Sequence, residues 1–152
     1  MLKVAIFTAE RSAEEISVSL LKSIEKVQIF KLYAASSDFL AKKFNCELIY
    51  DTSNLNAIGM VKSIQKALPI ANYIRSVSER IKDINPDIII FVDFGGTNVR
   101  LAKKLRSIGI KAPFIYFFPP GPWGKTQDEI NNLAQPFDLF LVPYKFYLEA
   151  YK

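Results

Sequence analysis

The chain has 152 residues, a formal net charge of +5 and 50% hydrophobic residues, which argues against a disordered protein and is enough for one domain with a core. Its single cysteine, Cys46, excludes an intramolecular disulfide, and the absence of histidine removes the usual zinc ligand and any Ser-His triad. Acid–base chemistry must therefore use Asp, Glu, Lys or Tyr side chains, and we expect neither a metal ion nor a cofactor.

Strand and helix patterns alternate along the whole chain. Apolar runs bounded by turn residues or helix breakers predict strands at 2–8, 27–34, 46–50, 88–92, 113–118 and 137–142. Amphipathic spacing predicts helices at 12–26, 38–44, 57–84, 98–108, 126–134 and 144–151.

Local signals mark where several of these helices begin or bend. Ser12 and Glu15 have the spacing of a capping box. Thr97 and Thr126 are each predicted to be the N-cap of the helix that follows. Pro69 is expected to break or kink the long central helix, because proline has no N–H to donate.

This alternation predicts a doubly wound parallel sheet with helices on both faces, which is a three-layer α/β/α, Rossmann-like fold. The strand order 3-2-1-4-5-6 would place the first and fourth strands side by side, with the topological switch point between them. Glu10 and Asp93 follow these two strands, so we expect both carboxylates to face one crevice at the ligand-binding edge.

The switch point offers several candidate site residues. Asp93 can accept a proton from a substrate hydroxyl, or can simply cap the loop that follows. Glu10 can bind a hydroxyl or assist Asp93, or can be a surface turn residue. Gly95 and Gly96 can let a ligand approach the backbone, or can merely permit a tight turn. Neither a Gly-x-Gly-x-x-Gly fingerprint nor a Walker A loop is present.

Two further features suggest contact with a sugar or a lipid surface. Trp123 lies among prolines and glycines, and it can stack on a sugar, enter a bilayer interface or anchor its own loop. The helix at 57–84 has a basic face that can lie on an anionic membrane, although a solvated face is the more frequent explanation. The basic residues are spread over several helices and form no recognition motif, so we expect no nucleic-acid binding.

Several blocks of the chain resemble the N-terminal half of lipid-A-disaccharide synthase, a bacterial inverting glycosyltransferase of the GT-B fold. The best block runs from Asn85 through Asp93 to Lys111, where the family has a strand ending Ile-Asp-Ala-Pro-Asp-Phe-Asn. Four weaker blocks also match. Residues 9–14 match a Gly-Glu-x-Ser-Gly-Asp turn of the family, and residues 56–60 match a Val-Met-Gly stretch. Residues 116–123 match a segment ending Ser-Pro-Ser-Val-Trp-Ala-Trp, and residues 137–151 match a Leu-Val-Leu strand with its Pro-Phe-Glu helix.

The resemblance implies a single acceptor-side domain over residues 1–152, with the C-terminal nucleotide-sugar domain absent. The family transfers a diacylglucosamine unit from a UDP-sugar to the 6-hydroxyl of diacylglucosamine 1-phosphate, a step of lipid A biosynthesis. By position, Asp93 matches the family's proposed general base and Glu10 its first-turn glutamate, and both are expected to be catalytic. The expected substrate-binding residues are Ser12, Gly95, Gly96, Asn98, Pro120 and Trp123.

The chain also departs from the family pattern at the same edge. Ala9 and Ala13 stand where the family has glycines, and Glu14 where it has aspartate. Gly96 replaces the second aspartate of the family motif, and Gly-Lys-Thr follows Trp123 in place of Ala-Trp-Arg. These changes affect the residues expected to choose the substrate.

Two functions are therefore compatible with the sequence. In the first, the chain is part of a hexosyltransferase that is incomplete alone and takes the UDP-sugar donor through a missing domain or a C-terminal partner half. In the alternative, it is a non-catalytic, stand-alone module that binds a lipid or sugar ligand. Because the first strand begins at Leu2 with no leader before it, we expect a cytoplasmic protein, in peripheral contact with the inner membrane where the glycolipid acceptor lies.

Overall fold

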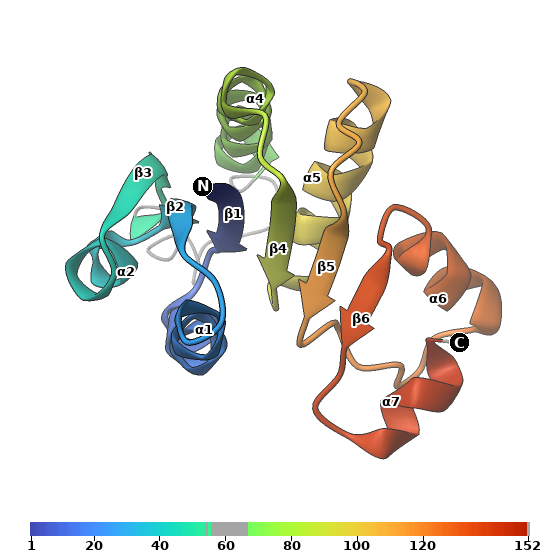
Figure 1. Ribbon diagram of the computed structural model, residues 1–152. Coiled ribbons are helices and arrows are strands. Elements are labelled where there is room, and N and C mark those ends of the chain that lie inside the picture. Colours follow the sequence, from blue (N-terminus) through green and yellow to red (C-terminus); the bar gives the residue numbers. More distant parts are fainter. Residues whose placement is uncertain (54, 56–66, 152) are drawn as a thin grey trace.

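A six-stranded sheet forms the centre of the computed structural model, which describes residues 1–53, 55 and 67–151 (Figure 1). All neighbouring strands pair in parallel, in the order β3-β2-β1-β4-β5-β6. The strands are β1 Leu2–Thr8, β2 Phe30–Ser36, β3 Cys46–Asp51, β4 Ile88–Val92, β5 Phe114–Phe117 and β6 Leu139–Leu141. The predicted fold class and strand order are thus confirmed.

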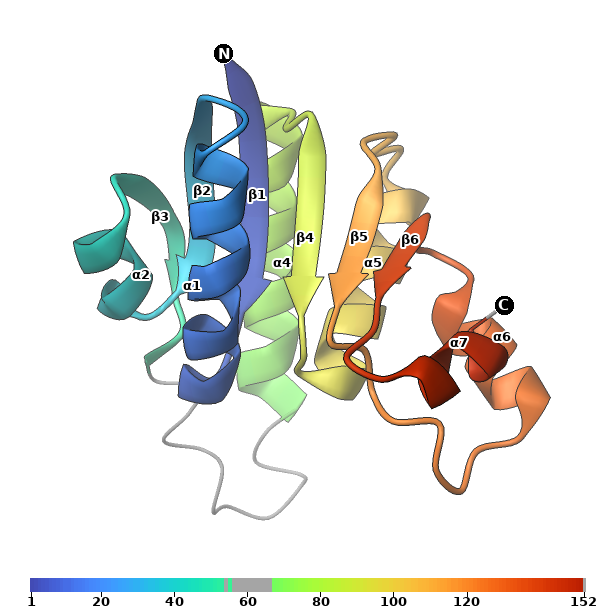
Figure 2. The same cartoon turned by 60° about the horizontal axis from the view of Figure 1, so that its bottom comes forward.

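Helices lie on both sides of this sheet. They are α1 Arg11–Glu25, α2 Asp38–Lys43, α4 Ala67–Ile84, α5 Gly95–Ser107, α6 Gln127–Ala134 and α7 Lys145–Ala150. Figure 1 shows α4 and α5 above the sheet and α1 below it, and Figure 2 shows α1 in front of β1 and β2. None of the helices in the described part of the chain is long and apolar enough to cross a bilayer.

Side chains alternate along the strands and pack into two hydrophobic cores, one on each side of the sheet. Phe7 and Phe91 point to the α4–α5 side, where their rings meet edge to face with centroids 5.0 Å apart. Ile6 and Val92 point to the α1–α2 side, where Leu21 packs against the sheet. Because β1 and β4 bury apolar side chains on both faces, they are central strands, as their continuous apolar runs predict.

Several predicted element boundaries are wrong by one to three residues, among them the starts of two helices and a strand. The first helix begins at Arg11, so Ser12 lies inside it and forms no capping box, and Glu15 pairs with Arg11 at 3.0 Å instead. The helix after the fourth strand, α5, begins at Gly95 with Phe94 as its N-cap, so Thr97 lies in its first turn. The second strand begins at Phe30 rather than residue 27, after a turn whose amides bond to the carbonyl of Ile24.

The predicted N-cap at Thr126 is confirmed, and a second side-chain cap marks the start of α2. Thr126 and Glu129 form a complete capping box at the start of α6. Ser37 is the N-cap of α2 and accepts a hydrogen bond from the amide of Phe39. Pro69 lies within α4, close to Ala67 at its first described residue, and the expected break or kink at Pro69 stays a prediction. The predicted helical turns at 57–66 and the family-like stretch at 56–60 lie outside the described residues.

A buried carboxylate ties α1 to the start of α2. Glu14 is only 1% exposed, and its oxygens accept hydrogen bonds from the Ser37 amide at 2.5 Å and the Ser37 hydroxyl at 2.8 Å. An ionised carboxylate is costly to bury unless it is hydrogen-bonded, so this contact fixes the two helices relative to each other. The glutamate at this position therefore has a structural role in the α1–α2 layer.

Replacing Ser37 with alanine removes both the α2 cap and the hydroxyl that bonds Glu14. We expect the free energy of unfolding to fall by about 1–3 kcal/mol, because a cap is lost and a buried carboxylate loses a donor. Urea denaturation measures this difference. Ser19→Ala, which removes an exposed hydroxyl that bonds only its own helix, is the matched control and should change stability very little. Equal effects of the two substitutions would contradict the role assigned to Glu14.

Candidate functional site

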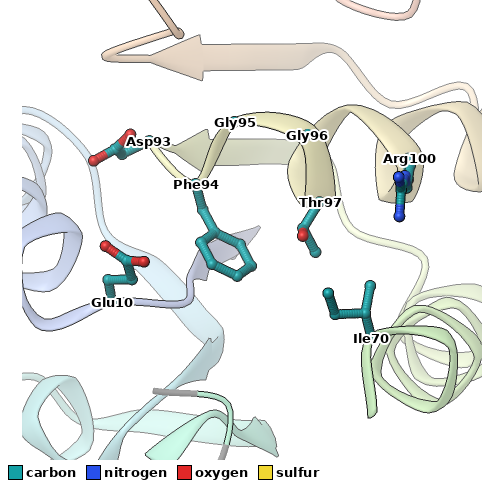
Figure 3. Close-up of a pocket in the computed structure, with 8 residues that line it drawn as sticks. All are labelled: Glu10, Ile70, Asp93, Phe94, Gly95, Gly96, Thr97 and Arg100. Atoms are coloured by element: carbon teal, nitrogen blue, oxygen red, sulfur yellow. The ribbon is translucent and has the colours of Figure 1, made fainter. Parts of the chain in front are cut away.

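The carboxyl ends of β1 and β4 meet at one edge of the sheet, and a pocket lies at the residues that follow them. The two strands pair so that Thr8 lies beside Val92, which brings the residues that follow each strand together. The pocket has a volume of about 520 Å³. Its lining residues, drawn in Figure 3, are Glu10, Ile70, Asp93, Phe94, Gly95, Gly96, Thr97 and Arg100.

The backbone turns sharply as it leaves β4. Asp93 and Phe94 are both left-handed, with φ angles of 48° and 53°, and Gly95 follows with φ of 22°. Left-handed backbone costs a non-glycine L-residue roughly 1–2 kcal/mol. Two such residues in succession are a local strain of the kind found at ligand sites, and the surrounding structure must hold them in place.

Hydrogen bonds hold the Asp93 peptide in this strained conformation. Its N–H donates to the carbonyl of Phe117 on β5 at 3.1 Å. Its carbonyl accepts from Nδ2 of Asn98 at 2.7 Å and from the hydroxyl of Tyr116 at 2.9 Å. Burial raises the pKa of Tyr116 well above its usual range, so the hydroxyl stays protonated and remains a donor. The position of Asp93 is therefore fixed from two neighbouring elements.

The carboxylates of Asp93 and Glu10 are not used by the fold itself. Within the described residues, the Asp93 carboxylate has no hydrogen-bond partner, while its backbone has three. Glu10 is exposed and occupies the N-cap position of α1, yet its side chain makes no capping hydrogen bond. Figure 3 shows both carboxylates at the same end of the pocket. This arrangement leaves two acceptor groups available to a bound molecule.

A positively charged side chain, that of Arg100, lies at the other end of the pocket. Arg100 lies one turn into α5, and Figure 3 shows it beyond Thr97 and Ile70, with the Phe94 ring between them and the carboxylates. Arg100 lines the pocket although no sequence motif indicated it as a site residue. Its place in the sequence could have indicated a site residue, because a side chain one turn into the helix after β4 lies beside the loop that joins strand and helix. The pocket thus combines proton acceptors at one end with a positive charge at the other.

The eight residues expected at the site fall into two groups. Glu10, Asp93, Gly95 and Gly96 line the pocket. Ser12, Asn98, Pro120 and Trp123 are not among the residues that line it.

Each residue of the second group has another environment. Asn98 is 1% exposed and lies behind the pocket, with its amide donated to the carbonyls of Val92 and Asp93. Its Oδ1 has no partner among the described residues. Ser12 is exposed on the first turn of α1, and the carbonyl of Pro120 accepts from the hydroxyl of Tyr151.

Trp123 is both packed and accessible. Its ring centroid lies 4.8 Å from that of Phe146, yet the residue is 68% exposed. A side chain on Gly121 would approach the Trp123 ring to 2.5 Å, so the ring needs glycine at that position. Two residues of the α7 region are exposed as well. Tyr144, the N-cap of α7, is 60% exposed, and Leu148 within α7 is 52% exposed. The loop anchor and the surface contact proposed for Trp123 are therefore compatible with each other.

No group of three or more Asp, Glu or Cys side chains that could hold a metal ion is found within residues 1–53, 55 and 67–151. Cys46 is a half-buried, free thiol on β3, and burial raises its pKa.

Comparison with known proteins places this geometry in context. The profile of the family described as Lipid-A-disaccharide synthetase matches residues 4–152. The lipid-A-disaccharide synthase of Nitrosococcus oceani is 24% identical over 149 residues, which cover 98% of this chain and 38% of that protein. The enzyme of the same name from Prochlorococcus marinus is 31% identical over 107 residues, covering 66% of this chain and 27% of that protein.

The fold also recurs in solved structures. UDP-N-acetylglucosamine 2-epimerase from Rickettsia bellii superimposes with a TM-score of 0.64 at 17% identity, over 99% of this chain and 41% of that one. At this identity the likeness concerns the fold alone. The chain spans about two fifths of the length of the Nitrosococcus oceani relative.

The hydrogen bonds that fix Asp93 can be tested through Asn98. Asn98→Asp replaces an amide that donates to two carbonyls with a carboxylate that repels them. We expect the free energy of unfolding to fall by about 2–3 kcal/mol, since a buried charge is left unpaired. Thermal and urea denaturation measure the change. Asn72→Asp, at an exposed position of α4, is the control and should have little effect. Equal stability of the Asn98 variant and the control would refute this account of the turn.

Proposed function

The chain belongs to the lipid-A-disaccharide synthetase family, and on that premise we propose that it is the acceptor-side part of a glycosyltransferase. The reaction transfers a diacylglucosamine unit from a UDP-sugar to diacylglucosamine 1-phosphate. The nucleotide-sugar would be held by a further domain, supplied by the same polypeptide or by a partner half. This proposal is supported by the family match over residues 4–152 and by the pocket at the switch point.

The carboxylate of Asp93 carries the proposal. It is the one group at the end of β4 whose backbone is held by three hydrogen bonds while its side chain has no partner among the described residues. A general base must be positioned firmly and must have a free oxygen within reach of the substrate proton. Because the chain has no histidine, a carboxylate is the natural base at this site.

The proposed step is a single displacement with inversion. Asp93 takes the proton of the acceptor 6-hydroxyl as that oxygen attacks the anomeric carbon of the UDP-sugar. The bond from the anomeric carbon to the UDP oxygen breaks, and UDP leaves with the bonding electron pair. Glu10 lies on the same side of the pocket and would accept a hydrogen bond from a sugar hydroxyl, which orients the acceptor.

Arg100 would contact the acceptor phosphate. It is the cationic residue among the described residues that line the pocket, and the acceptor carries its phosphate on the same sugar as the attacking hydroxyl. A guanidinium recognises phosphate through paired N–H donors. The carboxylate end and the Arg100 end of the pocket are thus suited to the two polar ends of one acceptor.

Peripheral contact with the inner membrane is a further part of the proposal. The exposed ring of Phe146 stacks on Tyr144, with centroids 5.4 Å apart, and packs at a tilt against Trp123, with centroids 4.8 Å apart. Aromatic residues of this kind sit well at a membrane interface, and Lys125 and Lys145 are exposed near them in sequence. A cytoplasmic location follows from the substrates proposed.

The alternative of a non-catalytic module that binds a lipid or sugar is favoured by one observation. Gly96 stands where the family has its second aspartate, and a Cβ at Gly96 would meet nothing within 4 Å. The position is therefore open, and one acidic group of the family pattern is lost from the pocket edge.

Asp93→Asn tests the catalytic role. We expect transfer from UDP-diacylglucosamine to diacylglucosamine 1-phosphate to fall by about 100- to 10,000-fold, since the amide cannot take the proton. The assay uses the chain alone and then with the part of the Nitrosococcus oceani relative outside the aligned residues. Asp128→Asn, at an exposed position of α6, is the control and should retain activity. Binding of the acceptor without any transfer, in either mixture, would establish the non-catalytic module instead.

Arg100→Gln tests the phosphate contact. We expect KM for the phosphorylated acceptor to rise by about five-fold with kcat nearly unchanged, because an exposed ion pair contributes about 1 kcal/mol. KM for an acceptor that lacks the phosphate should not change. Lys104→Gln, on an exposed part of α5 outside the pocket lining, provides the matched loss of charge. A similar rise of KM for both acceptors would remove Arg100 from phosphate recognition.

A further inference from the structure

Phe94 has a backbone conformation that phenylalanine rarely adopts. Its φ angle of 53° is left-handed, and it stands at the N-cap of α5, where its side chain makes no capping hydrogen bond. Glycine or asparagine would adopt this conformation at a lower cost, and asparagine would also be a good N-cap. Strained residues of this kind gather at ligand sites, where the surrounding structure holds them. The large ring at this position therefore needs a physical reason.

Packing within the described residues does not supply that reason. Phe94 is half-buried, and neither of the two hydrophobic cores formed by the described residues includes it. Phe118 is a useful comparison, because it is also left-handed, with a φ angle of 55°, but its ring packs edge to face against Phe117 with centroids 4.8 Å apart. The Phe94 ring instead lines the pocket.

The ring lies in the middle of that pocket. Figure 3 shows it between the carboxylates of Glu10 and Asp93 on one side and Arg100 on the other. Phe94 is the aromatic residue among the described residues that line the pocket, whose volume of about 520 Å³ is in the range that binds small molecules. An added Cβ at Gly96 would meet no atom within 4 Å, so the pocket is open at the start of α5.

A phosphorylated pyranose matches this order of groups. Its two faces carry C–H groups and its hydroxyls lie around the edge, so an aromatic ring can cover one face while the hydroxyls stay free to form hydrogen bonds. In the acceptor of the proposed function, the 6-hydroxyl arm and the 1-phosphate are attached to the two carbons that flank the ring oxygen. When the hydroxyl reaches Asp93 and the phosphate reaches Arg100, the sugar ring lies between them, at Phe94.

We propose that Phe94 is the platform on which the pyranose ring of the acceptor stacks. A sugar held flat on this ring directs its hydroxyl to Asp93 and its phosphate to Arg100. Phe94 is thus a specificity-determining residue that selects a cyclic sugar phosphate over an acyclic one. The inference rests on the proposed function for the identity of the acceptor, and it holds equally for a module that binds this sugar without catalysis.

Binding of glucosamine 1-phosphate to the 152-residue chain, followed by NMR, tests the platform. Protons that lie over an aromatic ring are shifted upfield by its ring current, so we expect upfield shifts of the pyranose protons on binding. These shifts should remain in Phe94→Tyr and vanish in Phe94→Leu, whose Kd should rise by about three- to ten-fold. Glucitol 6-phosphate, which has a phosphate and hydroxyls but no ring, should bind the parent chain and Phe94→Leu equally.

Two further variants separate binding from folding. Phe118→Leu is the matched control, because it replaces the other left-handed phenylalanine of the described residues and lies outside the pocket lining. It should leave both the shifts and Kd unchanged. Phe94→Asn places a residue that tolerates the left-handed conformation at the platform position. We expect its midpoint of thermal unfolding to be equal to that of the parent chain or higher, while its binding of glucosamine 1-phosphate is weakened.

Several outcomes would overturn the proposal. These are the absence of upfield shifts in the parent chain, equal Kd values for the parent chain and Phe94→Leu, and a clearly lower unfolding midpoint of Phe94→Asn, which would make the ring a packing residue. Because the test needs no sugar transfer, its failure is distinct from that of the proposed function. Binding that depends on Phe94, without transfer in any mixture, would sink the proposed catalysis and leave this inference standing. Transfer that depends on Asp93 but not on Phe94 would do the reverse.

Discussion

The parallel pairing of β1 with β4 is the constraint on which the rest of the structure depends. It joins segments about 80 residues apart in the chain, with Val4 beside Ile88 and Thr8 beside Val92. Hydrogen bonds between Lys3 and Asp87 fix the register at the start of the pair, through both backbone and side-chain atoms. Because the chain winds in opposite directions from these two strands, their carboxyl ends are left uncovered by either crossover, and the pocket opens there.

The site uses strain that neighbouring elements hold in place. Asp93 and Phe94 adopt a backbone that glycine would adopt more easily, and the cost is offset by Asn98 from α5 and Tyr116 from β5. Both supporting side chains are buried and donate to the backbone carbonyl of Asp93, so the carboxylate of Asp93 itself stays available. Asn98 therefore supports the turn after β4 by hydrogen bonds to the backbone, although its side chain does not line the pocket.

Some departures from the family pattern have a physical explanation in the fold. Ala9 and Ala13, which replace glycines, are 1% and 0% exposed, so small side chains are accommodated at both positions. Glu14, which replaces aspartate, reaches the amide and hydroxyl of Ser37 and so joins two helices. Gly96, where the resemblance places an aspartate, lines the pocket itself.

The sequence by itself determined the six strands, their order and the meeting of Glu10 and Asp93, because breakers and apolar runs are local and handedness restricts the topology. It placed Ser12 and Thr97 at helix starts that differ from those in the structure. Near Thr97 the reason is that hydrogen bonds of the Asp93 peptide with Phe117, Tyr116 and Asn98 impose a different turn. Only the tertiary structure brought Arg100 and Ile70 to the pocket. That outcome depends on how α4 and α5, which lie far apart in the chain, pack on the same side of the sheet, and local patterns do not encode this packing.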